Sequence, residues 1–103
     1  MLKHKTILLT GGSRGIGKAI KEAIESQGAK CIAPSRNQLD ISDLTSIESF
    51  FSSLDIEIDA LVNNAGINII NPIEKISDDD IEQMVSINLT ATLKLIHYAV
   101  KCM

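Results

Sequence analysis

A glycine-rich segment directly after a short apolar run strongly restricts the folds that this chain can adopt. Residues 10–17 are Thr-Gly-Gly-Ser-Arg-Gly-Ile-Gly, and they follow the strand-like run Thr6-Ile7-Leu8-Leu9. Gly11 and Gly15 allow a tight turn that brings backbone N–H groups close to a phosphate, and Gly17 allows the following helix to approach the strand without an intervening Cβ. The first turn of that helix would present free N–H groups and a positive dipole end to an anion. The segment therefore predicts a loop that holds a pyrophosphate, although a glycine pattern without this context can simply turn the chain.

Apolar runs of strand length alternate with segments of helical period along the rest of the chain. Strands are expected at 30–34 and 58–62, and a helix that Ser42 can cap lies between them. Ser77-Asp78-Asp79-Asp80 has the pattern of a capping box that begins a helix running toward the C-terminus. This order of elements predicts βαβ units and a parallel sheet. The first helix, from about Gly15 to Gln27, is expected to carry on one face the apolar residues Ile16, Ala19, Ile20, Ala23 and Ile24.

The composition indicates one small globular domain over residues 1–103, with 45% hydrophobic and 22% charged residues. The net charge is −3 and the ten Lys and Arg are scattered, so we expect no nucleic-acid partner, which would need a basic patch. The longest N-terminal apolar stretch is far shorter than a membrane span, so we expect no membrane segment and a cytoplasmic location. Cys31 and Cys102 form no metal-ligand cluster or disulfide framework. No metal is expected, and Cys31 is interpreted as a structural thiol.

Two further motifs follow the glycine segment in order. Asn63-Asn64-Ala65-Gly66 comes directly after the strand expected at 58–62, and Asn88 lies in the helical sequence Val85-Ser86-Ile87-Asn88-Leu89. Together with the T-G-x-x-x-G-x-G spacing at 10–17, these residues resemble the short-chain dehydrogenase/reductase family, classical type. The resemblance implies an α/β fold with a Rossmann-type parallel sheet, strand order 3-2-1-4 and flanking helices, and it implies that residues 1–103 are the N-terminal portion, truncated before the later strands.

The link between the second and third strands departs from the family pattern. Only Asn37, Gln38 and Leu39 separate Arg36 from Asp40, whereas parallel neighbours need a crossover of a dozen or more residues. The helix usually found there must be absent, so we expect the third strand to be rudimentary.

The residues after the second strand determine the expected cofactor. NAD-binding relatives carry an acid there that binds the adenosine ribose, and NADP-binding relatives carry a nearby arginine. Ser35 takes the position of the acid, Arg36 follows it, and Arg14 adds a second basic residue in the glycine loop. Two guanidinium groups can hold a 2′-phosphate, so NADP(H) is expected in preference to NAD(H). The alternative is that both arginines are solvated surface residues.

The resemblance implies further contacts with the cofactor. Asp40 and Ile41 resemble the family's Asp-hydrophobic pair, whose carboxylate accepts from the adenine amino group, although Asp40 could instead be a turn residue before a helix cap. Asn63, Ala65 and Gly66 would line the ribose and nicotinamide side, and asparagine also suits a turn in its own right. The residues expected to bind the cofactor are Gly11, Ser13, Arg14, Gly15, Ile16, Gly17, Ser35, Arg36, Asp40, Ile41, Asn63, Ala65 and Gly66.

Asn88 is the one expected catalytic residue, because it resembles the asparagine that kinks its helix and helps hold a water in the family's proton relay. The alternative is an exposed helix asparagine. Hydride chemistry in the family also needs a serine, a tyrosine and a lysine four residues after the tyrosine. That segment is missing here, since Tyr98 is the one tyrosine and Cys102 stands four residues after it. We therefore expect the isolated chain to be inactive.

Two functional hypotheses remain open. The first is an NADPH-dependent oxidoreductase that interconverts a carbonyl and an alcohol on a small molecule, similar to 3-oxoacyl-ACP reductases or to sugar and polyol reductases, of which this chain is the cofactor-binding part. In the family the helix bearing Asn88 helps form a dimer interface, so a homo-oligomer is expected. The alternative is a non-catalytic module that binds a nucleotide or pairs with another subunit.

Overall fold

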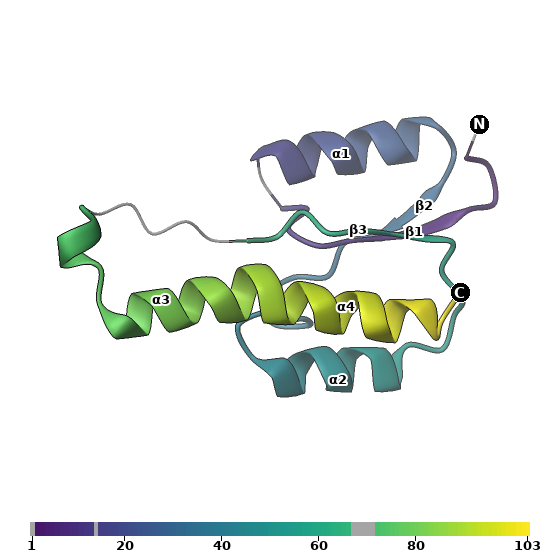
Figure 1. The fold of residues 1–103 in the computed structure, drawn as a ribbon. Helices are drawn as coiled ribbons and strands as arrows, with labels where there is room; N and C mark the ends of the chain where they lie inside the picture. The colour runs from purple at the N-terminus through teal and green to yellow at the C-terminus, as the bar shows by residue number, and fades with distance from the viewer. Residues whose placement is uncertain (1, 14, 67–71) are drawn as a thin grey trace.

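The computed structural model describes residues 2–13, 15–66 and 72–103, and its centre is a parallel sheet between two layers of helices (Figure 1). The strands are β1 (Thr6–Leu9), β2 (Lys30–Ile32) and β3 (Ala60–Val62), in the spatial order β2-β1-β3. One face of the sheet is covered by α1 (Gly15–Ser26), and the other by α2 (Leu44–Ser53) and α4 (Ala91–Val100). The predicted parallel α/β architecture is therefore confirmed.

The central strand β1 belongs to both hydrophobic layers. Leu8 pairs with Ile32 and Leu61 in register and packs into the cluster that contains Ile47 of α2 and Leu95 of α4. Ile7 faces the opposite way and packs with the α1 side. Because both faces of β1 are covered, its apolar residues form a continuous run instead of an alternating pattern.

The third strand, which we expected to be rudimentary, does not form in the described part of the chain. Residues 35–39 instead make a tight turn, in which the N–H groups of Gln38 and Leu39 donate to the carbonyl of Ser35 at 3.0 and 2.9 Å. A link of three residues is long enough for a turn but too short for a strand with its own crossover. Of the expected order 3-2-1-4, the sheet contains strands 2, 1 and 4, and the label β3 belongs to the strand that we expected as the fourth.

Two local predictions on the helices need correction. Asp43, not Ser42, is the N-cap of α2, because its side chain accepts the N–H of Thr45 at 3.0 Å. On α1 the apolar face is narrower than expected: Gly17 and Ile24 are buried and Ile20 is half-buried, but Ile16, Ala19 and Ala23 are exposed. A helix that covers so narrow a sheet buries only one row of its side chains.

The C-terminal helical segment is continuous but irregular. It consists of α3 (Asp78–Val85), a π-helical turn η2 (Ser86–Thr90) and α4, and a short 3-10 helix η1 (Ile73–Lys75) precedes it. Ser77 and Asp80 form the predicted capping box. The π-turn contains Asn88, the residue for which the resemblance implied a kink. Within the described part of the chain, no helix is long and apolar enough to cross a membrane.

Candidate functional site

The carboxyl ends of β1 and β3 are joined through the side chain of Thr10. Its hydroxyl accepts the backbone N–H groups of Asn64 and Ala65 at 3.1 and 3.0 Å, and its own N–H donates to the carbonyl of Val62. Thr10 is only 2% exposed, so these bonds are shielded from water. They hold the start of the glycine loop against the segment that follows β3.

The glycine loop is closed by a second contact from the same segment. The Asn64 side-chain amide donates to the carbonyl of Gly11 at 3.0 Å, and Gly11 has a positive φ of 69°. A Cβ at Gly17 would overlap the Gly11 carbonyl oxygen and come within 2.6 Å of Asn64 Nδ2. Gly17 is therefore needed because the first turn of α1 packs on the loop itself, a closer neighbour than the strand we expected it to approach.

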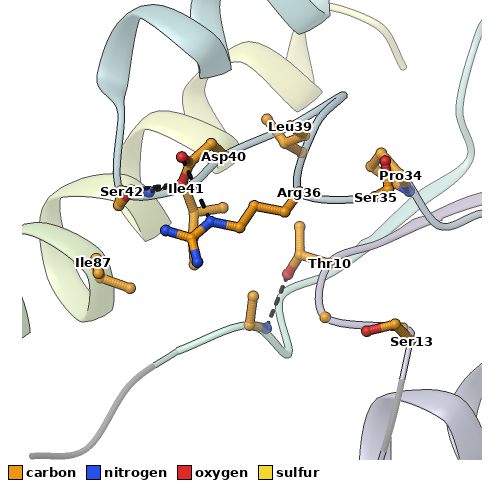
Figure 2. Close-up of a pocket in the computed structure, with 13 residues that line it drawn as sticks. Thr10, Ser13, Pro34, Ser35, Arg36, Leu39, Asp40, Ile41, Ser42 and Ile87 are labelled. Carbon is orange, nitrogen blue, oxygen red and sulfur yellow. Dashed lines mark hydrogen bonds and ion pairs between the residues drawn. The ribbon is translucent and has the colours of Figure 1, made fainter.

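A pocket of 340 Å³ opens where the glycine loop meets the turn after β2 (Figure 2). Ile41 lines it from the connection between β2 and α2, and Ile87, which is 8% exposed, lines it from the π-turn. The complete lining is Thr10, Gly11, Gly12, Ser13, Pro34, Ser35, Arg36, Leu39, Asp40, Ile41, Ser42, Ala65 and Ile87. The pocket is apolar in its middle, with an arginine at one end and the glycine loop at the other. This arrangement suits a planar base in the middle and a phosphate group at each end.

The polar contacts at one end of this pocket centre on Asp40. Its Oδ1 accepts the N–H and the hydroxyl of Ser42 at 3.0 and 2.5 Å, and its Oδ2 lies 3.7 Å from Nε of Arg36. The Ser42 hydroxyl and N–H, and then the Arg36 guanidinium, hold the pKa of the Asp40 carboxyl below its usual range. Figure 2 shows the Arg36 side chain extended across the pocket toward Asp40.

Asn88 lies next to the pocket without lining it. A Cβ added at Gly66 would stand 2.8 Å from Oδ1 of Asn88, so this side chain packs against the last residue of the Asn63–Gly66 motif. The π-turn brings both Ile87 and Asn88 to this end of the sheet. The helix therefore contributes an apolar and a polar side chain at consecutive positions.

Comparison with known proteins decides the family. A family model described as short chain dehydrogenase matches residues 37–103. The chain belongs to the short-chain dehydrogenase/reductase family. It is similar to the 3-oxoacyl-(acyl-carrier-protein) reductase FabG of Salmonella typhimurium, with 33% identity over 112 residues that cover 88% of this chain and 46% of the relative. It is also similar to the galactitol 2-dehydrogenase of Agrobacterium fabrum, with 34% identity over 109 residues that cover 85% of this chain and 43% of the relative.

Solved structures of the family share the fold. A short-chain dehydrogenase from Leptospira borgpetersenii with bound NAD+ superposes with a TM-score of 0.86 and 30% identity, over 97% of this chain and 46% of the other. The aldohexose dehydrogenase of Thermoplasma acidophilum superposes with a TM-score of 0.82 and 29% identity, over 99% of this chain and 45% of the other. The chain thus spans less than half the length of these relatives, and the resemblance drawn from its motifs is confirmed.

The structure brings together part of the predicted set of site residues. The predicted residues that line the pocket are Gly11, Ser13, Ser35, Arg36, Asp40, Ile41 and Ala65. Gly15, Ile16 and Gly17 form the start of α1 and Gly66 belongs to the segment after β3, and these four do not line the pocket. Arg14 is outside the described residues. Asn63 instead borders a separate groove with Ile96 and Ala99. Successive residues of an extended chain point in opposite directions, so Asn64 and not Asn63 reaches the glycine loop.

Several pocket residues were missed by sequence reasoning. Thr10 and Gly12 belong to the glycine motif itself and could have been included from it. Ser42 was assigned to the helix cap, and Ile87 had no signal other than its place beside Asn88. The pocket residues outside the predicted set are Thr10, Gly12, Pro34, Leu39, Ser42 and Ile87.

Tyr98 is half-buried, packs against the hydrophobic cluster between α2 and α4, and does not line the pocket. Its ring stacks on Phe51 of α2 with centroids 5.8 Å apart, and Lys101 Nζ lies 5.6 Å from the ring centre. In residues 2–13, 15–66 and 72–103, no group of three or more His, Cys, Asp or Glu side chains could hold a metal ion.

Proposed function

We propose that this protein is a cytoplasmic, NADP(H)-dependent oxidoreductase that interconverts a carbonyl and an alcohol, with residues 1–103 forming its cofactor-binding part. The observation that carries the proposal is the single pocket that the glycine loop, Arg36 and the Asp40–Ile41 pair share.

The pocket residues fit a dinucleotide in both shape and charge. A Cβ at Gly11 would lie 2.9 Å from Asn64 Nδ2, so the loop has glycine where the backbone must come close to its neighbours and to a pyrophosphate. Ser13 and the N–H groups of Gly15, Ile16 and Gly17, at the start of α1, would bind that pyrophosphate. When bound, the nicotinamide ring of such a cofactor supplies the hydride.

The choice of NADP(H) rests on Ser35 and Arg36. Both line the pocket, and the Arg36 side chain is 83% exposed, so its guanidinium, whose Nε lies 3.7 Å from Oδ2 of Asp40, is also accessible to an entering 2′-phosphate. A carboxylate at position 35 would repel that phosphate, and serine does not. Arg14 would add a second guanidinium from the glycine loop.

Asp40 and Ile41 would bind the adenine at the end of the pocket next to Arg36, while Ala65, Gly66 and Asn63 would follow the cofactor toward its nicotinamide. The carboxylate Oδ2 of Asp40 would accept the adenine amino group, with Ile41 against the ring. Asn88 would act beside Gly66 as the catalytic asparagine of the proton relay. Because Tyr98 is packed on Phe51, we expect the 103-residue chain to bind the cofactor without turnover.

The substrate is proposed from the relatives as a 3-oxoacyl thioester or as a sugar or polyol, where a polyol carries the alcohol that is oxidised to a carbonyl. The similarity to a 3-oxoacyl reductase and to a galactitol dehydrogenase supports these two classes. Both reactions exchange a hydride between carbon and nicotinamide, so the cofactor pocket serves either one.

A homo-oligomer is proposed from an apolar stripe along α3, η2 and α4. Asp78 and Asp79 begin this helical segment, and Lys94 and Lys101 lie toward its end, so an antiparallel second copy would place acidic residues beside basic ones. Sedimentation velocity should show a dimer that Leu93→Lys dissociates and Ile73→Lys, at another exposed site, does not. The exposed residues of the stripe are Ile81, Val85, Leu89, Leu93, Ile96 and Val100.

The cofactor proposal is tested by titrating the chain with NADPH and NADH and following nicotinamide fluorescence. We expect NADPH to bind at least tenfold more tightly, because a charge-assisted contact with a phosphate is worth about 1.5–3 kcal/mol. Equal affinities would contradict the choice of NADP(H), and no binding of either nucleotide would contradict the proposed site. Turnover of a carbonyl substrate by the chain alone would contradict the expected inactivity.

A further inference from the structure

Ser42 has a side-chain contact that helix capping does not explain. Asp43 caps α2, so the Ser42 hydroxyl is available for another partner, and it lies 2.5 Å from Oδ1 of Asp40. The N–H of Ser42 donates to the same oxygen at 3.0 Å. Ser42 also lines the pocket, so both of its donors act at the pocket wall (Figure 2).

Asp40 needs such a partner because it stands on a turn instead of a helix or strand. Its backbone is held by Ser46, whose hydroxyl accepts the Asp40 N–H at 2.9 Å, and by Asp43, whose N–H donates to the Asp40 carbonyl at 3.0 Å. These bonds fix the main chain but leave the carboxylate free to rotate. Among the described residues, the side chains that contact the carboxylate itself are those of Ser42 and the exposed Arg36.

We propose that Ser42 is a positioning residue, which holds Oδ1 of Asp40 so that Oδ2 stays available at the pocket to a hydrogen-bond donor on the bound base. The inference rests on the proposed function, in which that base is adenine and the donor is its amino group. Without Ser42 the carboxylate could turn both oxygens toward Arg36, since a guanidinium binds a carboxylate best through two parallel bonds. The base would then lose its acceptor.

A purely structural role for Ser42 predicts a different result. If Ser42 only shaped the turn, its loss would weaken all nucleotides alike, whatever groups the base carries. If Ser42 positions Asp40, its loss should weaken only those bases that donate from the 6-position. The charged group that faces Asp40 within the described residues is Arg36, and it is unchanged in both cases.

The test compares two nucleotides on four forms of the 103-residue chain. The nucleotides are adenosine 5′-monophosphate and purine riboside 5′-monophosphate, which lacks the 6-amino group, and their affinities are measured by calorimetry. The forms are the unchanged chain, Ser42→Ala, Ser42→Thr, which keeps the hydroxyl, and Ser49→Ala, which removes an exposed hydroxyl of α2 outside the pocket. A carbon-detected NMR titration of Asp40 accompanies each form, and circular dichroism checks the fold.

We expect the unchanged chain to prefer the adenine nucleotide, and Ser42→Ala to reduce that preference by roughly three- to tenfold. Ser42→Thr and Ser49→Ala should keep it, and the pKa of Asp40 should rise in Ser42→Ala alone. If the unchanged chain prefers adenine and Ser42→Ala does too, the positioning role is wrong while the proposed site stands. If the unchanged chain binds neither nucleotide, the proposed site fails and the positioning role fails with it.

Discussion

The hydroxyl of Thr10 accepts the backbone N–H of Ala65 at 3.0 Å, although the two residues are 55 positions apart in the chain. This bond joins the end of β1 to the segment after β3 at the point where the pocket begins. The glycine loop and the Asn63–Gly66 motif are therefore parts of one structure, and a substitution in either segment should change the conformation of the other.

The first prediction concerns Thr10 itself. Thr10→Val keeps the shape of the side chain but leaves the N–H groups of Asn64 and Ala65 without their acceptor. These N–H groups lie against Thr10, which is 2% exposed. We therefore expect the free energy of unfolding to fall by up to about 1–3 kcal/mol for each N–H group that loses its acceptor. Urea unfolding measures the change, and Thr10→Ser, which keeps the hydroxyl, is the control. A valine variant as stable as the unchanged chain would show that the two bonds contribute nothing.

The second prediction compares two glycines of the same loop. In Gly17→Ala the new methyl would overlap the Gly11 carbonyl oxygen, so the loop or α1 must shift, at a cost of about 1–3 kcal/mol or more. In Gly15→Ala no atom of the described residues, apart from the chain neighbours and the backbone of α1, lies within 4 Å of the new methyl, so the cost of about 1–2 kcal/mol comes from the positive φ of 60°.

Thermal unfolding and nucleotide affinity should both separate these glycine variants. Gly17→Ala should lose nucleotide binding, whereas Gly15→Ala should lose mainly stability. Similar losses of binding in the two variants would argue against close packing of α1 on the loop as the reason for Gly17.

The third prediction concerns the arginine of the pocket. Arg36→Ala should lower the affinity for NADPH by roughly ten- to a hundredfold and leave that for NADH nearly unchanged, because only NADPH carries the 2′-phosphate. Lys30→Ala removes an exposed positive charge on β2 outside the pocket and serves as the control for general electrostatics. An equal loss for both cofactors would remove Arg36 from the 2′-phosphate site.

The fourth prediction concerns the pH dependence of Cys31 alkylation. Burial, and then the nearby Glu25 carboxylate, raise the pKa of the Cys31 thiol, against a smaller lowering effect of Lys21. Only the thiolate reacts with iodoacetamide, and a free cysteine has a pKa of about 8.5. In a Cys102→Ser chain, the alkylation rate of Cys31 should therefore rise at a higher pH than the rate of a free cysteine. Glu25→Gln should move the midpoint back down. A midpoint at or below the free value would contradict this environment.

Local sequence patterns predicted the helices and strands well. They predicted less well which side chains contact one another. The capping box at Ser77, the strands at 58–62 and 30–34 and the alternation of strand and helix all depend on neighbours in sequence, and the structure contains them with shorter strands. The N-cap of α2 shows the limit of this reasoning. Ser42 and Asp43 are both good caps, and the geometry of the Asp40 turn decides between them.

Apolar periodicity, glycine positions and short motifs are enough to predict the parallel α/β fold, the glycine turn and the family. Two outcomes required the folded structure: Asn64 and not Asn63 closes the glycine loop, and Ile87 lines the pocket. Each of them depends on which face of the chain is turned toward a partner far away in sequence. Pairing of that kind is fixed only when the sheet and its two helical layers pack together.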